Sequence, residues 1–430
     1  MTMKTIRILL AVMPYEGEVQ DRVTARFYKN KAVKYMPLGL LSLAANIPPH
    51  YEVSVLDAAS RGLSLDETIA EIEAFAPDVL GLSVVTYRAW AMTEILRRTS
   101  APIKVVGGPH ATRNHALIRQ QGAHAVFVDD AEVIFPQWLD QGCPPGVFFG
   151  GQVNLDRIPL PARHLLDLAD YRIEKNPDML FDVGSLRLPM FSSKGCPYAC
   201  IYCDVQQKEF NFKSAGRCVE EFQQLIALGT TSVHILDDAF NVNRQRVSDL
   251  SHALIEAEIT VDWSARGTVE VRESVIADLA AAGCKRLHIG IESLDDNILA
   301  YFKKASRYKH IETFCRLCDK YGIDILGYFI IGAPGETEAY RQALPQRIRD
   351  LGIRLPFFNL LSPLAETPYY EDLLRTGIFK KDYWKEFCVN PVRDFIIPEV
   401  RTIVEENELK STIDDYVAYF KRDDMPIFVS

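Results

Sequence analysis

Residues 194–204 read KGCPYACIYCD and place three cysteines, Cys196, Cys200 and Cys203, in C-x3-C-x2-C spacing. Three thiols this close together do not suit a disulfide framework. A tetrahedral zinc site needs a fourth ligand, and no histidine lies between Gly195 and Lys213. Three thiolates do suit a [4Fe-4S] cluster that keeps one iron free of protein ligands. We predict such a cluster, with a structural zinc site or incidental thiols as the alternatives.

The cysteine motif directly follows the first of six apolar stretches that have the character of buried strands. Helical stretches separate these strands, which are predicted at residues 188–193, 232–238, 260–266, 286–293, 324–332 and 353–361. Six parallel βα units form most of a TIM-type barrel, whose functional loops lie at the C-terminal ends of the strands. We therefore predict a partial (βα)6 barrel over residues 186–370, with the cysteine motif at its mouth.

The N-terminal part alternates strand and helix patterns in the same way. Its strands are predicted at residues 6–12, 51–57, 78–85, 103–108 and 123–129. The fold class is therefore α/β, beginning with a flavodoxin-like doubly wound domain over residues 1–145, whose ligands sit at the carboxyl ends of the strands. Residues 146–185 lack clean periodicity and are predicted to be a linker. Residues 371–430 are predicted to be a short helical extension that covers the barrel mouth.

Composition restricts the classes of partner. The chain has 430 residues, 48% of them hydrophobic, and a net charge of −9, which argues against nucleic acid as a partner. We see neither a secretory signal nor an apolar run long enough to span a membrane. Nine irregularly spaced cysteines suggest a reducing cytoplasm. Among them, Cys315 and Cys318 are predicted to be buried helix residues rather than ligands of a second cluster.

With the motif and the barrel pattern in place, the C-terminal two-thirds resembles the radical S-adenosylmethionine (SAM) superfamily, including the aromatic Tyr202 before the last cysteine. The resemblance implies that the three cysteines hold a [4Fe-4S] cluster whose fourth iron is chelated by SAM. Reductive cleavage of SAM would then give a 5′-deoxyadenosyl radical that abstracts hydrogen from a substrate carbon. A low-potential electron donor, flavodoxin or ferredoxin, is implied as a partner.

Four further segments at predicted strand ends match SAM-binding segments of the family: HILDDAFN, WSARG, HIGIESLDD and GYFIIGAPGET. Taken singly, each is also explained by a helix cap, a surface ion pair or a turn. Their order along the barrel argues against coincidence. In relatives the acidic pair lies near the SAM amino group, and an arginine such as Arg266 pairs with the SAM carboxylate. The implied SAM residues are Tyr202, Asp237, Asp238, Ser264, Arg266, Glu292, Ser293, Gly332, Gly335 and Asn359.

The N-terminal domain resembles the cobalamin-binding domain of one radical SAM subclass, in MPLGLLSLAA (36–45), PDVLGLSVVT (77–86) and VVGGPHAT (105–112). No D-x-H-x-x-G stretch is present, so a histidine ligand to cobalt is not expected. Relatives carry a G-E-G-E-like turn where this chain reads VDDAEV (128–133), which leaves cobalamin binding open. The residues implied to line a corrin or interdomain pocket are Tyr15, Ser83, Thr86, Tyr87, Gly107, Gly108, His110 and Asp129.

Three functions remain open. The first is a cobalamin-dependent radical SAM methyltransferase acting on a small organic substrate of natural-product biosynthesis. The second is cobalamin-independent dehydration, deoxygenation or epimerisation, for example of an aminoglycoside, with a vestigial corrin-binding domain. The third is a non-catalytic cobalamin or iron–sulfur sensor, against which the series of SAM-binding segments argues. No general acid or base can be assigned, and the candidates by position near strand ends are Tyr328, Asp204 and His288.

The substrate class is inferred from charge alone. A polar or cationic substrate would suit the acidic side chains predicted near the strand ends. These are Asp129, Asp130, Asp237, Asp238 and Glu292.

Overall fold

The computed structural model describes residues 5–19, 34–173, 184–205, 208–269, 272–421 and 428–429, which form two compact units. Among these residues, the first unit contains 5–19, 34–171 and 381–396. The second contains 172–380 and 397–429, within the same limits. A segment from near the C-terminus therefore belongs to the N-terminal unit.

The first unit is built on a parallel sheet in the order β2-β1-β3-β4-β5-β6. Its strands are β1 (Arg7–Val12), β2 (Glu52–Asp57), β3 (Val79–Ser83), β4 (Ile103–Gly107), β5 (Ala125–Asp129) and β6 (Gly146–Gly151). The first five match the predicted strands, because continuous apolar runs are buried on both faces of a parallel sheet. The strand order reverses between β1 and β3, and doubly wound sheets bind ligands beyond the strand ends at such a point.

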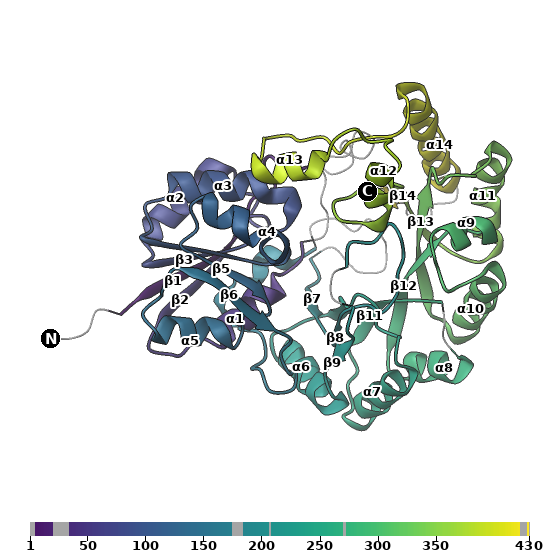
Figure 1. Cartoon of the computed structure of the whole chain (residues 1–430). Helices are drawn as coiled ribbons and strands as arrows, with labels where there is room; N and C mark the ends of the chain where they lie inside the picture. Colours follow the sequence, from purple (N-terminus) through teal and green to yellow (C-terminus); the bar gives the residue numbers. More distant parts are fainter. Residues whose placement is uncertain are drawn as a thin grey trace. The chain divides into compact units, whose positions relative to one another are not determined.

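Helices cover both faces of this sheet, with α1 and α5 on one face and α2, α3 and α4 on the other (Figure 1). They are α1 (Leu38–Ala45), α2 (Leu65–Phe75), α3 (Ala89–Arg98), α4 (Pro109–Gln120) and α5 (Ile134–Asp140), with the short turns η2 (Thr86–Arg88), η3 (Arg163–Leu165) and η4 (Leu168–Tyr171). The start of α2 shows why the chain turns helical there: Ser64 and Glu67 form a reciprocal capping box.

The structure differs from the prediction at residues 146–151, which were assigned to a linker. They form β6, which pairs in parallel with β5 and completes the sheet. The sequence GVFFGG hides this strand because glycine is a poor strand former and Phe149 is exposed. The following connection is also fixed to the sheet, since the hydroxyl of Tyr171 donates to buried Asp57 at the end of β2 (2.7 Å).

The second unit contains the predicted partial barrel. Its sheet has the order β15-β14-β13-β12-β11-β10-β7, and all pairs are parallel. The strands are β7 (Arg187–Met190), β10 (Ser232–Ile235), β11 (Asp262–Gly267), β12 (Cys284–Glu292), β13 (Asp324–Ile331), β14 (Leu355–Leu360) and β15 (Phe428–Val429). The cysteine loop is inserted after β7, between the short antiparallel strands β8 (Ser193–Lys194) and β9 (Asn211–Phe212).

Helices line one face of this curved sheet (Figure 1). They are α6 (Ala215–Ala227), α7 (Arg244–Glu256), α8 (Glu273–Ala281), α9 (Asp296–Tyr301), α10 (Tyr308–Tyr321) and α11 (Glu338–Asp350). Two further helices follow in the chain, α12 (Pro368–Arg375), whose start contacts the cysteine loop, and α14 (Ile403–Lys421). Both Cys315 and Cys318 are buried on α10, as predicted.

The helical extension predicted for residues 371–430 does not act as one cover for the barrel mouth. Its helix α14 packs beside α11, where the Tyr416 hydroxyl donates to the Arg341 carbonyl (2.8 Å) and the Tyr416 ring contacts Phe358 of β14. Its helix α13 (Tyr383–Val389) belongs to the first unit instead. Amphipathic periodicity predicts a helix but not the surface that buries it, which is why the sequence missed this division.

Candidate active site

The three cysteines lie on one loop that is held at several points by the second unit. The Ile201 carbonyl accepts from the Tyr369 amide at the start of α12 (2.8 Å), and the Ile201 amide donates to the Phe302 carbonyl at the end of α9 (3.3 Å). The ring of Tyr202 packs edge-on against Phe302, with ring centroids 5.1 Å apart. The loop is therefore fixed from its middle as well as from its ends.

The cysteine side chains remain partly accessible to solvent and form no disulfide. Burial, followed by the adjacent Asp204, Cys200 and Cys196, raises the pKa of Cys203 to about 11. Burial also raises the pKa of Cys196, to which Cys200 contributes. A bound metal reverses this tendency because it stabilises the thiolate form. Among the described residues, no three His, Cys, Asp or Glu side chains are grouped to hold a single metal ion.

The two acidic residues at the end of β10 differ in their surroundings. The Asp237 carboxylate is fully buried and accepts hydrogen bonds from Ser192 and Ser193. The Asp238 side chain is exposed and accepts from the amide of Gly195, the residue before the first cysteine (3.0 Å). Of the two carboxylates, only that of Asp238 remains accessible to a molecule bound at the cysteine loop.

The predicted SAM residues of β11 also separate. Arg266 is half-buried at the end of β11. Burial raises the pKa of Asp238, and the positive charge of Arg266 opposes that rise, so the two side chains lie within electrostatic reach of each other. Ser264 lies deeper and is fully buried, with its hydroxyl 2.7 Å from Nδ1 of His234 and accepting from Arg187 (2.8 Å). The structure thus places Asp238 near Arg266, whereas Ser264 belongs to a buried polar network with His234 and Arg187.

At the end of β12, Glu292 adopts a left-handed backbone conformation (φ 66°), which is unusual for a residue other than glycine. Its carboxylate pairs with Lys304 (3.5 Å). Burial, followed by the negative charge of Glu292, raises the pKa of the Tyr202 phenol well above its usual range, so Glu292 acts electrostatically on the cysteine loop. The adjacent Ser293 hydroxyl is buried within 2.8 Å of the Tyr340 hydroxyl.

The glycine-rich end of β13 contains two positive-φ glycines with different surroundings. Gly332 has φ 85°, a conformation that favours glycine, and a Cβ atom there would lie 2.7 Å from the movable guanidinium of Arg401. A Cβ on Gly335 would meet no atom within 4 Å, which leaves open space at this end of the predicted SAM-binding segment. Asn359 is half-buried on the neighbouring strand β14.

The candidates for proton transfer do not converge on one point. Nδ1 of buried His288 lies 3.4 Å from the hydroxyl of half-buried Tyr328, and burial holds the pKa of His288 well below its usual range. Asp204 is exposed on the cysteine loop. His288 is therefore neutral at physiological pH, and no assignment of a general acid or base follows.

The charge argument for a cationic substrate is weakened by the structure. Asp237 and Glu292 are buried and paired with Arg246 and Lys304, so they present no free negative charge. Sequence reasoning counted these acids by position, and burial decides whether their charge reaches a ligand.

In the first unit, the predicted pocket residues all follow strand ends. Gly108 makes the turn from β4 into α4, where a Cβ would lie 2.9 Å from the Val84 amide nitrogen. Behind this turn, Nδ1 of His110 contacts the hydroxyl of Thr86 (3.2 Å) and the amide of Asn114 (3.3 Å). The Nε2 atom of His110 is buried without a hydrogen-bond partner among the described residues.

The loops after β1 and β3 meet at Arg88. Its guanidinium lies over the Tyr15 ring (4.2 Å), pairs with Glu18 (3.2 Å) and donates to the Met13 carbonyl (3.1 Å). Ser83 is half-buried at the end of β3, and the Tyr87 carbonyl accepts from the Val19 amide (2.9 Å). The structure therefore brings Tyr15, Ser83, Tyr87 and the Gly107–Gly108 turn to one edge of the sheet.

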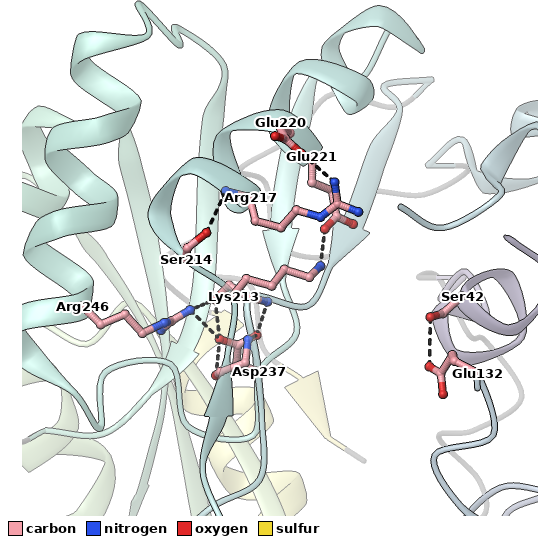
Figure 2. Close-up of polar contacts among 11 residues, drawn as sticks. Ser42, Glu132, Lys213, Ser214, Arg217, Glu220, Glu221, Asp237 and Arg246 are labelled. Carbon is pink, nitrogen blue, oxygen red and sulfur yellow. Dashed lines mark hydrogen bonds and ion pairs between the residues drawn. The ribbon is translucent and has the colours of Figure 1, made fainter. Parts of the chain in front are cut away.

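The acidic turn after β5 has three carboxylates in different surroundings, and the half-buried Asp130 accepts from the Val153 amide (3.2 Å). Asp129 is exposed, with φ 63°, and its amide donates to the Thr112 hydroxyl (3.1 Å). Glu132 is buried and accepts from the Ser42 hydroxyl of α1 (2.9 Å; Figure 2). The exposed Asp129 keeps negative charge at this strand end, as predicted, whereas Glu132 directs its carboxylate inward.

Residues 381–396 form a C-terminal strap, which sequence reasoning did not connect to this unit. Trp384 of the strap packs edge-on against Tyr87 (5.8 Å) and beside Phe395 (5.3 Å), and Arg393 lies over Trp90 (5.5 Å). The Gln121 side chain donates to the Cys388 carbonyl (2.9 Å), and α13 lies next to α4 (Figure 1). The high content of aromatic residues at 383–395 was the sequence feature that could have indicated that this segment packs against another part of the chain.

The comparisons with known proteins find a match in each of the two units. Residues 190–347 match the radical SAM superfamily, and residues 30–139 match the B12 binding domain. The chain contains a radical SAM domain and a B12-binding domain. Its cofactors are accordingly a [4Fe-4S] cluster, SAM and cobalamin, the last of which the acidic turn had left open. The enzyme hypothesis is supported over the sensor hypothesis.

Relatives in sequence span nearly the whole chain. The uncharacterized methyltransferase PH0819 of Pyrococcus horikoshii is 26% identical over 421 residues, which cover 91% of this chain and 88% of the relative. The bacteriochlorophyllide d C-12(1)-methyltransferase of Chlorobaculum tepidum is 26% identical over 83% of this chain and 77% of its own length. The chain is thus similar to methyltransferases that share its length.

A solved structure supports the fold. The radical SAM methyltransferase TsrM from Kitasatospora setae, with cobalamin and a [4Fe-4S] cluster bound, has a TM-score of 0.70 at 17% identity and covers 99% of this chain and 91% of its own. Identity this low shows a shared fold alone. None of the described helices is long and apolar enough to cross a membrane.

Proposed function

We propose that the protein is a cobalamin-dependent radical SAM methyltransferase that methylates a small organic molecule. The main support is that one chain contains two such sites. The second unit has a cysteine loop beside Asp238 and Arg266, and the first unit has a tight glycine turn at the carboxyl ends of its strands. When bound, the cofactors supply radical formation from SAM and a cobalt-carried methyl group. No observation of this chain specifically favours dehydration or epimerisation.

The second unit has the donor set that a cluster and SAM require. We propose that Cys196, Cys200 and Cys203 hold the cluster, since three thiols on one loop leave one iron for SAM. The methionine part of SAM is a zwitterion, and the neighbouring Asp238 and Arg266 offer one charge for its ammonium group and one for its carboxylate. Open space at Gly335 accommodates a planar base.

The first unit has a donor that suits cobalamin. Nδ1 of His110 lies 3.3 Å from the side-chain nitrogen of Asn114, and Nε2 has no partner among the described residues. We propose the tautomer in which Nδ1 accepts from Asn114 and Nε2 carries the proton. An unpaired buried donor is costly unless a ligand supplies an acceptor. Cobalamin carries amide and phosphodiester oxygens that accept hydrogen bonds. We propose that His110 donates to one of them, and that Gly108 keeps the adjacent turn narrow.

The partners follow from the chemistry. A small-molecule substrate and a low-potential reductase of the flavodoxin or ferredoxin type are proposed, because SAM cleavage consumes an electron that none of the protein's side chains supplies. We propose a cytoplasmic location from the nine cysteines, all of which are free thiols in the structure.

The test does not require the substrate. The chain is reconstituted anaerobically with iron, sulfide and hydroxocobalamin, reduced, and incubated with SAM that carries a deuterated methyl group. We expect retained cobalamin after gel filtration and S-adenosylhomocysteine formation by mass spectrometry, as the label passes from SAM to cobalamin. A chain that binds the cluster and cleaves SAM to 5′-deoxyadenosine while ignoring cobalamin would contradict methyl transfer.

A further inference from the structure

Asp237 holds the chain just ahead of the cysteine loop. Its two oxygens accept four hydrogen bonds, from the amides and the hydroxyls of Ser192 and Ser193, at 2.5 to 2.9 Å. All three residues are buried, with at most 1% of their surface exposed. Because every donor belongs to the two residues that precede Lys194 and Gly195, the carboxylate fixes the direction in which the chain enters the loop (Figure 2).

Arg246 of α7 supplies the compensating charge. One guanidinium nitrogen lies 3.8 Å from the Asp237 carboxylate and also donates to the Ser192 hydroxyl, and another donates to the Phe240 carbonyl (3.0 Å). The guanidinium is 5.4 Å from the ring of Phe240 and 5.6 Å from the ring of Phe212 on β9. The pair is thus buried, and the same arginine contacts Ser192, the residue before β8, and Phe212 of β9.

The chain leaves the loop under a similar constraint. The Lys213 amide donates to the Ser192 carbonyl (2.9 Å), which joins the residue after β9 to the residue before β8. The Lys213 ammonium forms a buried ion pair with Glu221 of α6 (Figure 2). The entrance and the exit of the loop therefore meet at Ser192, next to Asp237.

This geometry leaves no oxygen of Asp237 for SAM. We propose that Asp237, paired with Arg246, is a positioning residue for the cysteine loop, and that the adjacent Asp238 is left to act on SAM. Asp237 orients Ser192 and Ser193, and Asp238 accepts a hydrogen bond from the Gly195 amide. These aspartate contacts end at Gly195, the residue directly before Cys196. The proposal rests on the proposed assignment of the three cysteines as cluster ligands.

The decisive variant is Asp237→Asn. Asparagine keeps one acceptor oxygen for the two serine amides, but its NH2 group cannot accept from the two serine hydroxyls, which must turn and accept instead. The substitution also removes the negative charge opposite the buried Arg246 guanidinium. Partners that orient metal ligands typically change metal affinity by about 10–100-fold when mutated. We therefore expect the variant's reconstituted cluster to lose iron to a chelator about tenfold faster, with an altered electron paramagnetic resonance spectrum of the reduced cluster. Its dissociation constant for SAM should remain within about threefold of the wild-type value.

Glu220→Gln is the matched control, because Glu220 is an exposed carboxylate of the same region that pairs with Arg217. It should leave iron release and the spectrum unchanged. Thermal unfolding of the metal-free chains checks that each variant is folded. If Asp237→Asn does not fold, Ser193→Ala replaces it, since it removes one donor and should change iron release and the spectrum in the same direction.

Two results would overturn the proposal. One is a folded variant with wild-type iron release and spectrum. The other is an intact cluster whose dissociation constant for SAM rises tenfold or more, which would make Asp237 a SAM ligand. The failure of the proposed function looks different, because the wild-type chain itself would then not take up about four irons on reconstitution.

Discussion

Gly108→Ala tests whether the turn into α4 is as tightly constrained as the structure indicates. Gly108 has φ 90° and ψ −178°, a region that is essentially restricted to glycine. A Cβ there would also lie 2.9 Å from the Val84 nitrogen and 3.0 Å from the Val84 oxygen, and backbone atoms cannot rotate away. Backbone strain of about 1–3 kcal/mol and a similar cost of overpacking should lower the free energy of unfolding by about 3 kcal/mol.

The matched control is Gly62→Ala in the same unit. Gly62 also has a positive φ, 67°, but a Cβ there would meet no atom within 4 Å. Its cost should be about 1 kcal/mol, from the left-handed conformation alone. Because 1 kcal/mol shifts the midpoint by about 2–4 °C in a domain of this size, calorimetry should show the Gly108 variant melting about 6–12 °C lower and the control about 2–4 °C lower.

The functional readout is cobalamin retention after gel filtration, which should fall in the Gly108 variant and not in the control. Equal melting temperatures for the two variants would refute the steric reasoning. Normal cobalamin retention by a destabilised Gly108 variant would show that this turn does not contribute to cobalamin binding.

Three further predictions concern single groups. Cys200→Ala should bind no stable [4Fe-4S] cluster and form no 5′-deoxyadenosine, and a retained cluster absorption band would contradict the ligand assignment. Glu221→Ala leaves the buried Lys213 ammonium unpaired and should cost about 3–5 kcal/mol in urea unfolding, against about 0–1 kcal/mol for exposed Glu220→Ala. Burial, with a contribution from Arg113, lowers the pKa of His110 to about 4. Since the unfolded state then binds the extra proton, stability should fall as pH drops from about 6.5 to 4, by about 3 kcal/mol, and His110→Gln should remove that part of the pH dependence.

The sequence predicted the elements whose signal is local. The apolar runs of β1 to β5 and of the six barrel strands gave the α/β fold, because buried parallel strands have continuous hydrophobic sequences. The cysteine spacing likewise predicted the cluster loop, since ligands on one short loop need no tertiary information. Strand β6 was missed because its glycines and exposed Phe149 depart from that pattern.

What the sequence did not predict depends on contacts between distant residues. Asp237 and Asp238 are neighbours with the same chemistry, yet one is buried under two serines and the other is exposed. Likewise, Glu292 is paired with Lys304 and is not a free acid. Burial and pairing of this kind are set by which elements pack together, and no alternation or spacing in the local sequence encodes them.

The C-terminal strap has a consequence for how the chain is made. Its residues 381–396 complete a unit whose other described residues end at 171. Ribosomes extend a chain from its N-terminus at about 5–20 residues per second, so the strands of the barrel emerge before the N-terminal unit has its last segment. The N-terminal unit therefore cannot complete its packing during synthesis before the barrel strands have emerged. A fragment that ends after residue 171 would also leave Tyr87 without its contact to Trp384 and Trp90 without its contact to Arg393.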